Sequence, residues 1–267
     1  SWAQLTAPKP VKAPVRKKAV AKKGVVKKPA PPVTAAAAAG PVIVPAIAEK
    51  VKVLEFTADG RGGLLAGTDR GLYRSYDLTK GWEKLPFGPG FNDDVFAIHT
   101  SAARPNTIWV GTATSGVLVS RDQGKTWTRT GGAVDNIPVS SIMSDPKRPD
   151  YVYVGTTQAF YLTRNGGETW NRRGGGLTLG NFTSILINPV NTDEILISSS
   201  VVTDGGVFIS TDAGNKWSRI DTKDMKLPSR RVWAMAFDPQ DPDRIFAATH
   251  SSGIYRIERS ARTAAGM

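Results

Sequence analysis

The stretch that decides the fold is GVLVSRDQGKTW at residues 116–127, because its pattern returns three more times without gaps. A short apolar run is followed by Ser or Thr, then by Asp or Asn, then by Gly, and finally by Trp. The copy at residues 71–82 has Thr79 at the place of this Gly. The tryptophans at 82, 127, 170 and 217 are thus 45, 43 and 47 residues apart. Such a regular step predicts a repeat architecture. The other copies are GLYRSYDLTKGW at 71–82, AFYLTRNGGETW at 159–170 and GVFISTDAGNKW at 206–217.

Each repeat also has an earlier half, in which a turn rich in Asp, Asn and Pro separates two short runs typical of β-strands. In the third unit the four runs fall at Val139–Ser144, Tyr151–Gly155, Phe160–Thr163 and Trp170–Arg173. No segment carries a ten-residue helical stripe of apolar side chains. Four short strands per unit, in tandem units of about 45 residues, predict an all-β protein with the β-propeller fold.

We expect five four-stranded blades, because five runs can serve as first strands. The fifth unit lacks a good fourth strand. The apolar segment Pro41–Ile47 precedes the first unit, and we expect residues 41–48 to supply the missing outer strand and to close the last blade. Pro45 is tolerable there because one edge of an outermost strand stays unpaired. The first-strand runs are Val51–Phe56, Asp94–His99, Val139–Ser144, Thr183–Asn188 and Arg231–Asp238.

The polar residues of the repeat are predicted to be structural. An Asp or Asn side chain can accept hydrogen bonds from the backbone N–H groups of its own turn, Gly supplies a backbone angle that other residues resist, and Trp fills the space between blades. A carboxylate bound in this way is poorly placed to move protons to a substrate. The residues concerned are Ser75, Asp77, Trp82, Ser120, Asp122, Gly124, Trp127, Thr163, Asn165, Gly167, Trp170, Ser210, Asp212, Gly214 and Trp217.

The pattern Ser/Thr-x-Asp/Asn-x-Gly-x-x-Trp resembles the Asp-box, also called the bacterial neuraminidase repeat. Propellers of sialidases, sortilin-like receptors, xyloglucanases and photosystem II stability/assembly factors contain it, and the resemblance covers about residues 51–260. The photosystem assembly factors are the most similar in the arrangement of the repeats. The resemblance implies a propeller that holds subunits of a membrane complex, although the five expected blades are fewer than those families have.

Charge is concentrated at the start of the chain. The whole sequence holds 35 Lys and Arg against 23 Asp and Glu, and residues 1–50 contain ten of these bases but a single acid, Glu49. Residues 1–40 are rich in Ala, Pro and Lys, which predicts an extended arm without a packed core. This arm is either a solvated linker or a segment that binds a negatively charged partner. Its basic residues are Lys9, Lys12, Arg16, Lys17, Lys18, Lys22, Lys23, Lys27 and Lys28.

Composition excludes several kinds of site. Cysteine is absent, which removes disulfides, thiolate metal sites and cysteine nucleophiles, and only His99 and His250 could act as histidine ligands. No run reaches the ~18 apolar residues of a membrane-spanning helix. We therefore expect no metal and no cofactor. A chain that starts at Ser1 fits either processing, such as loss of a signal peptide, or trimming, and we expect an exported protein.

Catalysis is not expected from the sequence. The resemblance to sialidases implies three arginines, a tyrosine nucleophile with a glutamate base, and an acid, and glycoside hydrolysis in general needs two carboxyl groups facing one cleft. Glutamates are few, and Glu168 and Glu83 lie in or beside repeat turns. We expect a protein that is not an enzyme, with a glycan-binding or sialidase-like hydrolase as the alternative.

The function expected from the sequence is that of an exported accessory or assembly subunit at a membrane surface. Its domains would be an arm at 1–40, a propeller at 41–260 and a tail at 261–267. Its partners would be subunits of a membrane protein complex, photosynthetic by resemblance, and an anionic lipid surface is a second candidate for the basic arm. Nucleic acid is disfavoured, because Trp2 is the only aromatic residue among residues 1–50.

Overall fold

The protein is described by a computed structural model that covers residues 34–36, 41–177, 180–221, 227–241 and 243–258. The chain divides into the units 1–30 and 31–267, and all described residues belong to the second unit. Strands dominate the described residues, and the one helix among them is a single 3-10 turn, η1 (Leu78–Lys80). The predicted all-β class is confirmed.

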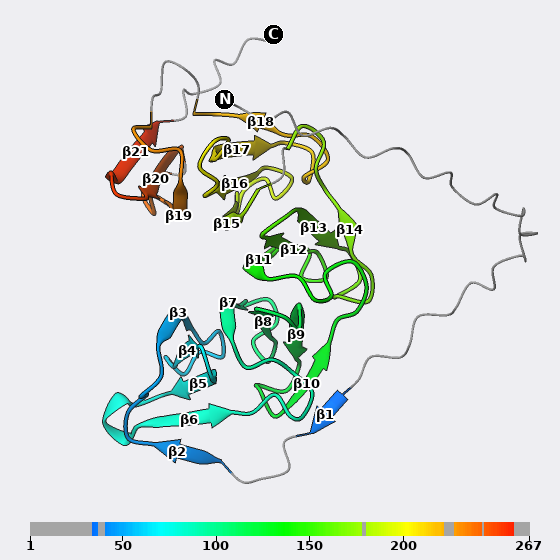
Figure 1. Ribbon diagram of the computed structural model, residues 1–267, viewed down its shortest axis with the longest axis vertical. Coiled ribbons are helices and arrows are strands. Elements are labelled where there is room, and N and C mark those ends of the chain that lie inside the picture. The colour runs from blue at the N-terminus through cyan, green and yellow to red at the C-terminus, as the bar shows by residue number, and fades with distance from the viewer. Residues whose placement is uncertain (1–33, 37–40, 178–179, 222–226, 242, 259–267) are drawn as a thin grey trace, which may run out of the picture. The chain divides into compact units, whose positions relative to one another are not determined.

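Five antiparallel sheets follow one another along the chain, which is consistent with a five-bladed β-propeller (Figure 1). In each of the first four sheets, four consecutive strands pair with their neighbours in sequence. The strands are β3 (Val51–Phe56), β4 (Leu64–Thr68), β5 (Gly71–Ser75) and β6 (Trp82–Leu85); β7 (Val95–Thr100), β8 (Ile108–Thr112), β9 (Val117–Ser120) and β10 (Thr126–Arg129); β11 (Val139–Ser144), β12 (Val152–Thr156), β13 (Phe160–Thr163) and β14 (Asn171–Arg172); β15 (Phe182–Ile187), β16 (Ile195–Ser199), β17 (Gly206–Ser210) and β18 (Ser218–Arg219); and β19 (Val232–Phe237), β20 (Arg244–Thr249) and β21 (Gly253–Glu258).

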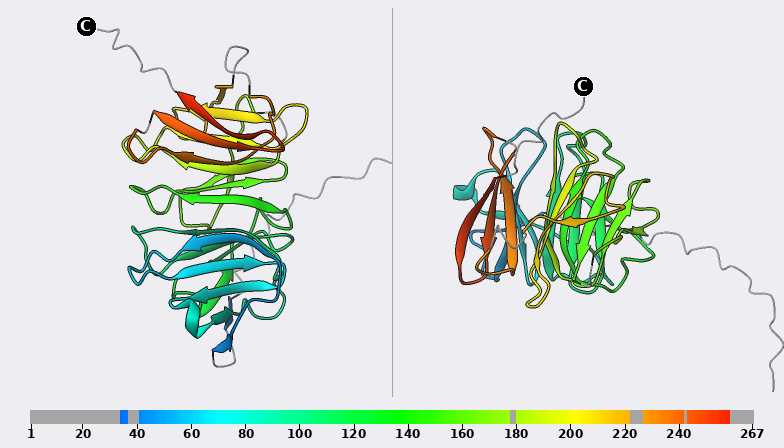
Figure 2. Two further views of the ribbon diagram at one scale, coloured as in Figure 1. Left: turned by 90° about the vertical axis from the view of Figure 1, so that its left-hand side faces the viewer. Right: turned by 90° about the horizontal axis from the view of Figure 1, so that it is seen from above.

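Successive side chains of a strand point to opposite faces of the sheet, and nearly continuous buried runs such as those of β8, β12 and β16 let each inner sheet bury both of its faces. The sheets stand one after another in the order of the chain (Figure 2). Four buried apolar clusters result, one between each pair of successive sheets. Aromatic rings and branched side chains fill these clusters. They contain Leu65, Leu72 and Trp127 between the first and second sheets, Trp109, Val139 and Trp170 between the second and third, Phe160, Phe182 and Ile197 between the third and fourth, and Leu196, Val232 and Ile245 between the fourth and fifth.

No corresponding cluster joins the fifth sheet to the first within the described part of the chain. The outer faces of these two sheets consequently expose apolar side chains. On β3, Leu54 and Phe56 are 55% and 74% exposed, and on β21 Ile254 is 72% exposed. The contrast with the buried faces of the other sheets means that the described residues leave these two faces without a covering layer.

The prediction that residues 41–48 supply the outer strand of the last blade is wrong, because this segment lies in the first blade. Strand β2 (Val42–Val44) pairs with β6 and extends the first sheet, while the fifth sheet has three strands in the described residues. The short connection to β3 explains this position. Only residues 45–50 separate β2 from β3, and an extended connection of this length spans about 20 Å, the width of one four-stranded sheet. A second added strand, β1 (Thr34–Ala36), pairs with β10 of the second sheet.

Candidate functional site

The Asp-box turns hold their own polar side chains. In the second sheet, Ser120 Oγ donates to Asp122 Oδ1 over 2.7 Å, and the backbone N–H of Gly124 donates to Ser120 Oγ over 2.7 Å. Asp122 Oδ1 also accepts from the backbone N–H of Thr126. Burial alone would raise the pKa of Asp122, but these hydrogen bonds lower it further than burial raises it. The carboxylate is therefore held in its charged form within the turn.

The same bonds recur in the next two repeats, where Thr163 pairs with Asn165 and Ser210 pairs with Asp212, each over 2.8 Å. Gly167 and Gly214 donate to the hydroxyl oxygens as Gly124 does. In the first sheet the arrangement differs, because Asp77 caps η1 and Ser75 Oγ donates to the carbonyl of Gly81. The contacts fit the structural role expected for these residues, which remains a prediction.

The box tryptophans lie between sheets. Trp127 packs edge-on against Phe87, which follows β6 of the first sheet, with ring centroids 4.8 Å apart, and Trp217 packs against Phe160 of the third sheet at 5.2 Å. Trp170 meets Trp109 of the second sheet in the same way. Each ring thus faces the preceding sheet. Trp82 of the first sheet has no preceding sheet in the described residues, and it is only partly buried.

The nine basic residues predicted for the arm, from Lys9 to Lys28, lie outside the described residues. Nothing in the structure tests their role.

A hollow lies where the first strands of all five sheets converge. Its volume is about 770 Å³. Phe96, Met143 and Trp233 give it apolar surface, and the lining also contains Ser, Thr and Asn side chains. We call this hollow the hub cavity. Its other lining residues include Lys52, Val53, Leu54 and Glu55 of β3, Ser140 to Ile142 of β11, Asn181, Thr183 to Ile185 of β15, and Ala234 and Met235 of β19.

Two charged residues of β3 line the hub cavity. Lys52 forms an ion pair with Asp94, and its ammonium group lies 4.3 Å from the centre of the Phe96 ring. Glu55 is partly buried, and this burial raises its pKa to about 7. Because a carboxyl group with a pKa near neutrality can both give and take a proton, Glu55 is the titratable group of the cavity best suited to proton transfer.

Side chains of the first strands also tie neighbouring sheets together around the hub cavity. Each is a hydroxyl that donates to a backbone carbonyl of an adjacent sheet, and such bonds fix the walls of the cavity relative to one another. The bonds are Thr100 Oγ1 to Phe56 O over 2.7 Å, Ser141 Oγ to Phe182 O over 2.8 Å and Thr183 Oγ1 to Val232 O over 2.7 Å.

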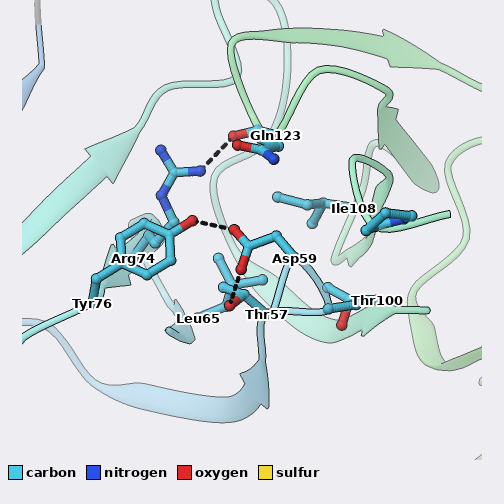
Figure 3. A pocket seen from close by; sticks show the side chains of 10 residues that line it. Thr57, Asp59, Leu65, Arg74, Tyr76, Thr100, Ile108 and Gln123 are labelled. Carbon is cyan, nitrogen blue, oxygen red and sulfur yellow. Dashed lines mark hydrogen bonds between the residues drawn. The ribbon is translucent and has the colours of Figure 1, made fainter. Parts of the chain in front are cut away.

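A second, much smaller pocket lies between the first and second sheets (Figure 3). Tyr76 Oη donates to Asp59 Oδ2 over 2.5 Å, Arg61 forms an ion pair with the same carboxylate, and Arg74 donates to the backbone carbonyl of Gln123. Burial would raise the pKa of Asp59, but the bonds from Tyr76 and Arg61 hold it well below its usual range. The pocket has a volume of about 10 Å³, room for one water, so this cluster joins two sheets and cannot admit a substrate.

His99 is buried between the second and third sheets. Its Nε2 lies 2.8 Å from Ser144 Oγ, and both side chains are less than 10% exposed. Burial lowers the pKa of His99 to about 4, so the ring is neutral near pH 7. A substrate cannot reach this pair, and the burial of His99 is typical of a structural side chain.

The described residues contain no group of three or more His, Asp or Glu side chains placed to hold a metal ion. They also contain no helix with the length and apolar character needed to span a membrane.

Comparisons with known proteins support the repeat and the fold. The BNR/Asp-box repeat family matches residues 118–129. A probable oligoxyloglucan-reducing end-specific xyloglucanase of Neosartorya fischeri is 34% identical over 56 residues, which are 20% of this chain and 7% of that protein.

Solved structures are similar over most of this chain. An ancestral GH74 enzyme is 18% identical with a TM-score of 0.67, over 82% of this chain and 31% of that one. The GH74 xyloglucanase of Xanthomonas campestris is 18% identical with a TM-score of 0.64, over 82% and 38%. YCF48 bound to a D1 peptide is 15% identical with a TM-score of 0.57, over 85% and 69%. This chain thus spans about a third of these two GH74 enzymes.

The expectation that the chain is not an enzyme needs correction. Xyloglucanases occur both as the curated relative and among the structures of the same fold, so the repeat and the fold are compatible with glycoside hydrolysis. The sequence reasoning also missed the hub cavity and Glu55. The sequence could have pointed to Glu55 as a residue of the cavity, because Glu55 lies on a predicted first strand and the first strands of a propeller surround its centre. The chain is a β-propeller that carries the BNR/Asp-box repeat.

Proposed function

We propose that the chain is an exported accessory subunit that holds an extended segment of a membrane protein in the hub cavity. The observation that carries this proposal is the cavity itself, which has a volume of about 770 Å³ and is lined by the first strands of five sheets. A cavity of this size lies in the range of binding sites for small ligands and peptide side chains. The fold that this chain shares with YCF48 bound to a D1 peptide supports a peptide as the occupant.

The lining suits a peptide chemically. Leu54 and Trp233 are 55% and 44% exposed, so both side chains are accessible to apolar groups of a ligand in the cavity. Hydroxyls such as those of Ser141 and Thr183 donate to neighbouring sheets, yet they keep lone pairs that can accept from peptide N–H groups. The cavity therefore offers apolar contacts for side chains and acceptors for a backbone.

The basic segment from Lys9 to Lys28 supplies the second part of the proposal. Such a segment attracts an acidic protein face or anionic lipid headgroups, each Lys near a charged lipid surface contributing about 1 kcal/mol. This attraction weakens with salt, whereas apolar contacts in the hub cavity do not. Salt dependence therefore separates the two contributions to binding.

Removal of the apolar side chains of the hub cavity tests the proposal. In the double variant Leu54→Ala/Trp233→Ala, we expect affinity for extended peptides from water-exposed membrane-protein segments, the D1 peptide among them, to fall about tenfold or more, equivalent to ~1.4 kcal/mol. Binding is measured by fluorescence polarisation of labelled peptides. Val190, which is 76% exposed and does not line the hub cavity, gives the matched control Val190→Ala. Equal binding by all three proteins, or no peptide binding by the unchanged protein, would count against the proposal.

Glycoside hydrolysis is the second candidate, and Glu55 is the observation that favours it. Its pKa of about 7 suits a general acid, and Trp233 in the same cavity offers an aromatic surface on which a sugar ring can stack. No other carboxyl group is among the residues that line the hub cavity. The similarity to xyloglucanases makes xyloglucan oligosaccharides the first substrates to try.

For this second candidate, we expect Glu55→Gln to reduce turnover of xyloglucan oligosaccharides by about 100-fold or more, because the amide cannot transfer a proton. Release of reducing ends is the measurement. Glu168→Gln, which makes the same change at an exposed residue that does not line the cavity, is the control and should retain most of the activity. Hydrolysis by the unchanged protein that survives Glu55→Gln would remove Glu55 from the reaction, and an inactive unchanged protein would remove the candidate.

A further inference from the structure

Glu55 brings a carboxyl group without a counterion to the hub cavity. It forms no hydrogen bond and no ion pair within the described residues, and burial is the cause of its raised pKa. The side chain lines the cavity and is only partly buried, so a ligand in the cavity can reach it. Ionisation of such a group is costly, because no nearby cation replaces the water that burial removes.

The fold places Glu55 among apolar side chains. Side chains two residues apart on a strand share a face, so Glu55 lies on the same face of β3 as Val53, which packs against the buried cluster between the first and second sheets. Its neighbour across the strand pair is Leu65 of β4, which is fully buried in that cluster. Strand β7 lies beside β3 (Figure 1) and gives the cavity Phe96 and Ile98. The aliphatic stem of a long side chain can therefore pack next to the carboxyl group.

The strands around Glu55 bring no charge to it. Strand β4 has no ionisable residue, and neither have β11, β15 and β19. On β7 the ionisable side chain is His99, which is neutral near pH 7 and contacts Ser144 of the third sheet. Lys52 is the one base among the described lining residues, and it is already paired with Asp94. Among these lining residues, Glu55 is therefore the one ionisable group whose charge has no counterion.

We propose that Glu55 recognises a lysine or arginine side chain of the peptide in the hub cavity. This inference rests on the proposed peptide-binding function and names the kind of segment that the cavity takes, an extended one in which apolar residues flank a base. The bound cation is the counterion that Glu55 lacks, and its stem packs against the apolar lining near Phe96. Hydrogen bonds from an ammonium or guanidinium group to a carboxylate are about twice as strong as those between neutral groups.

Recognition of a cation changes the protonation of Glu55. A nearby positive charge favours the charged form of a carboxyl group, so the pKa of Glu55, about 7 before the peptide binds, falls in the complex. Near pH 7, binding therefore releases a proton, and the affinity for a basic peptide rises as the pH rises through 7. Glycoside hydrolysis with Glu55 as the general acid has the opposite dependence on pH, because a general acid acts in its protonated form.

Paired peptides test the proposal on the unchanged full chain. Both members of a pair have a capped, extended sequence of alternating leucine and serine, with either lysine or norleucine at one position, and the pair is made for every position in turn. Norleucine keeps the aliphatic stem and removes the charge. By fluorescence polarisation, we expect a position at which lysine binds about tenfold more tightly than norleucine at about pH 8, and less than about twofold more tightly at about pH 5.5. Long-range attraction cannot produce this preference, because the protein has a formal net charge of +12.

Two variants assign the preference to Glu55. Glu55→Gln should abolish the preference for lysine at both pH values, and Glu168→Gln, the same change at an exposed residue outside the cavity, should retain it. NMR of the carboxyl carbon gives an independent readout in the unchanged protein. We expect the pKa of Glu55 to fall from about 7 to about 6 or lower with the lysine peptide, and not to fall with the norleucine peptide.

The outcomes separate this inference from the function on which it rests. Equal binding of lysine and norleucine peptides at every position, or a preference for lysine that survives Glu55→Gln, would overturn the role of Glu55 and leave peptide binding in place. If no peptide binds to the unchanged protein at either pH, both the role of Glu55 and the proposed function are wrong.

Discussion

Replacement of Trp127 by alanine is expected to lower the free energy of unfolding by about 4 kcal/mol, the cost typical of a buried Trp. The side chain is fully buried between the first and second sheets, with its ring against Phe87. Its indole N–H makes no hydrogen bond within the described residues, so the contribution is one of apolar packing. Urea unfolding followed by circular dichroism gives the difference.

Trp233→Ala is the matched control, because the same side chain is removed from a site where the ring is 44% exposed. We expect a loss of about 1 kcal/mol or less there, since little packing disappears. A similar loss in both variants would mean that the box tryptophan does not hold the sheets together. That result would also remove the main support for a structural Asp-box.

The repeat made most of the fold predictable from the sequence. Strand formation is a local property, and the box residues fix each hairpin through bonds within one turn, such as those between Ser120 and Asp122. Two of the four strands predicted for the third unit, Val139–Ser144 and Phe160–Thr163, have the observed bounds. The other two differ by one residue at each end.

Contacts between distant segments were less predictable. Residues 41–48 were assigned to the last blade because their composition suits any outer strand, whereas the observed pairing of β2 with β6 depends on how the chain connects β2 to β3. Glu55 was overlooked for a related reason. Its raised pKa arises from burial, and burial depends on how β3 stands beside the other first strands. No local pattern carries that information.

Buried His99 and partly buried Glu55 give the stability an unusual dependence on pH, because their pKa values are shifted in opposite directions. His99 has a pKa of about 4 in the folded chain and an ordinary value of 6.5, so the unfolded chain binds more protons between these values. The stability from His99 is complete above pH 6.5 and is lost as the pH falls through 4. At about pH 4.5, this loss amounts to about 2.5 kcal/mol.

Glu55 acts in the opposite sense. Its pKa is about 7 in the folded chain against an ordinary value of 4.5, so the folded chain binds more protons between these values. Its contribution is complete below pH 4.5 and is lost as the pH rises through 7. This contribution of Glu55 to the free energy of unfolding is about 2 kcal/mol. It is smaller than the pKa shift alone would give, because Glu55 is partly exposed to water. Between about pH 4.5 and 7.5, the two effects nearly cancel.

Single variants should separate these two effects. Comparing about pH 7.5 with about pH 4.5, we expect the free energy of unfolding of the unchanged protein to differ by about 1 kcal/mol or less from these two groups. Glu55→Gln should lose about 2.5 kcal/mol on acidification, because His99 then acts alone, and His99→Gln should gain about 2 kcal/mol, because Glu55 then acts alone. Urea unfolding at the two pH values measures both differences. The double variant is the control for all other carboxylates, and parallel pH profiles of the two single variants would show that neither group is shifted as the structure requires.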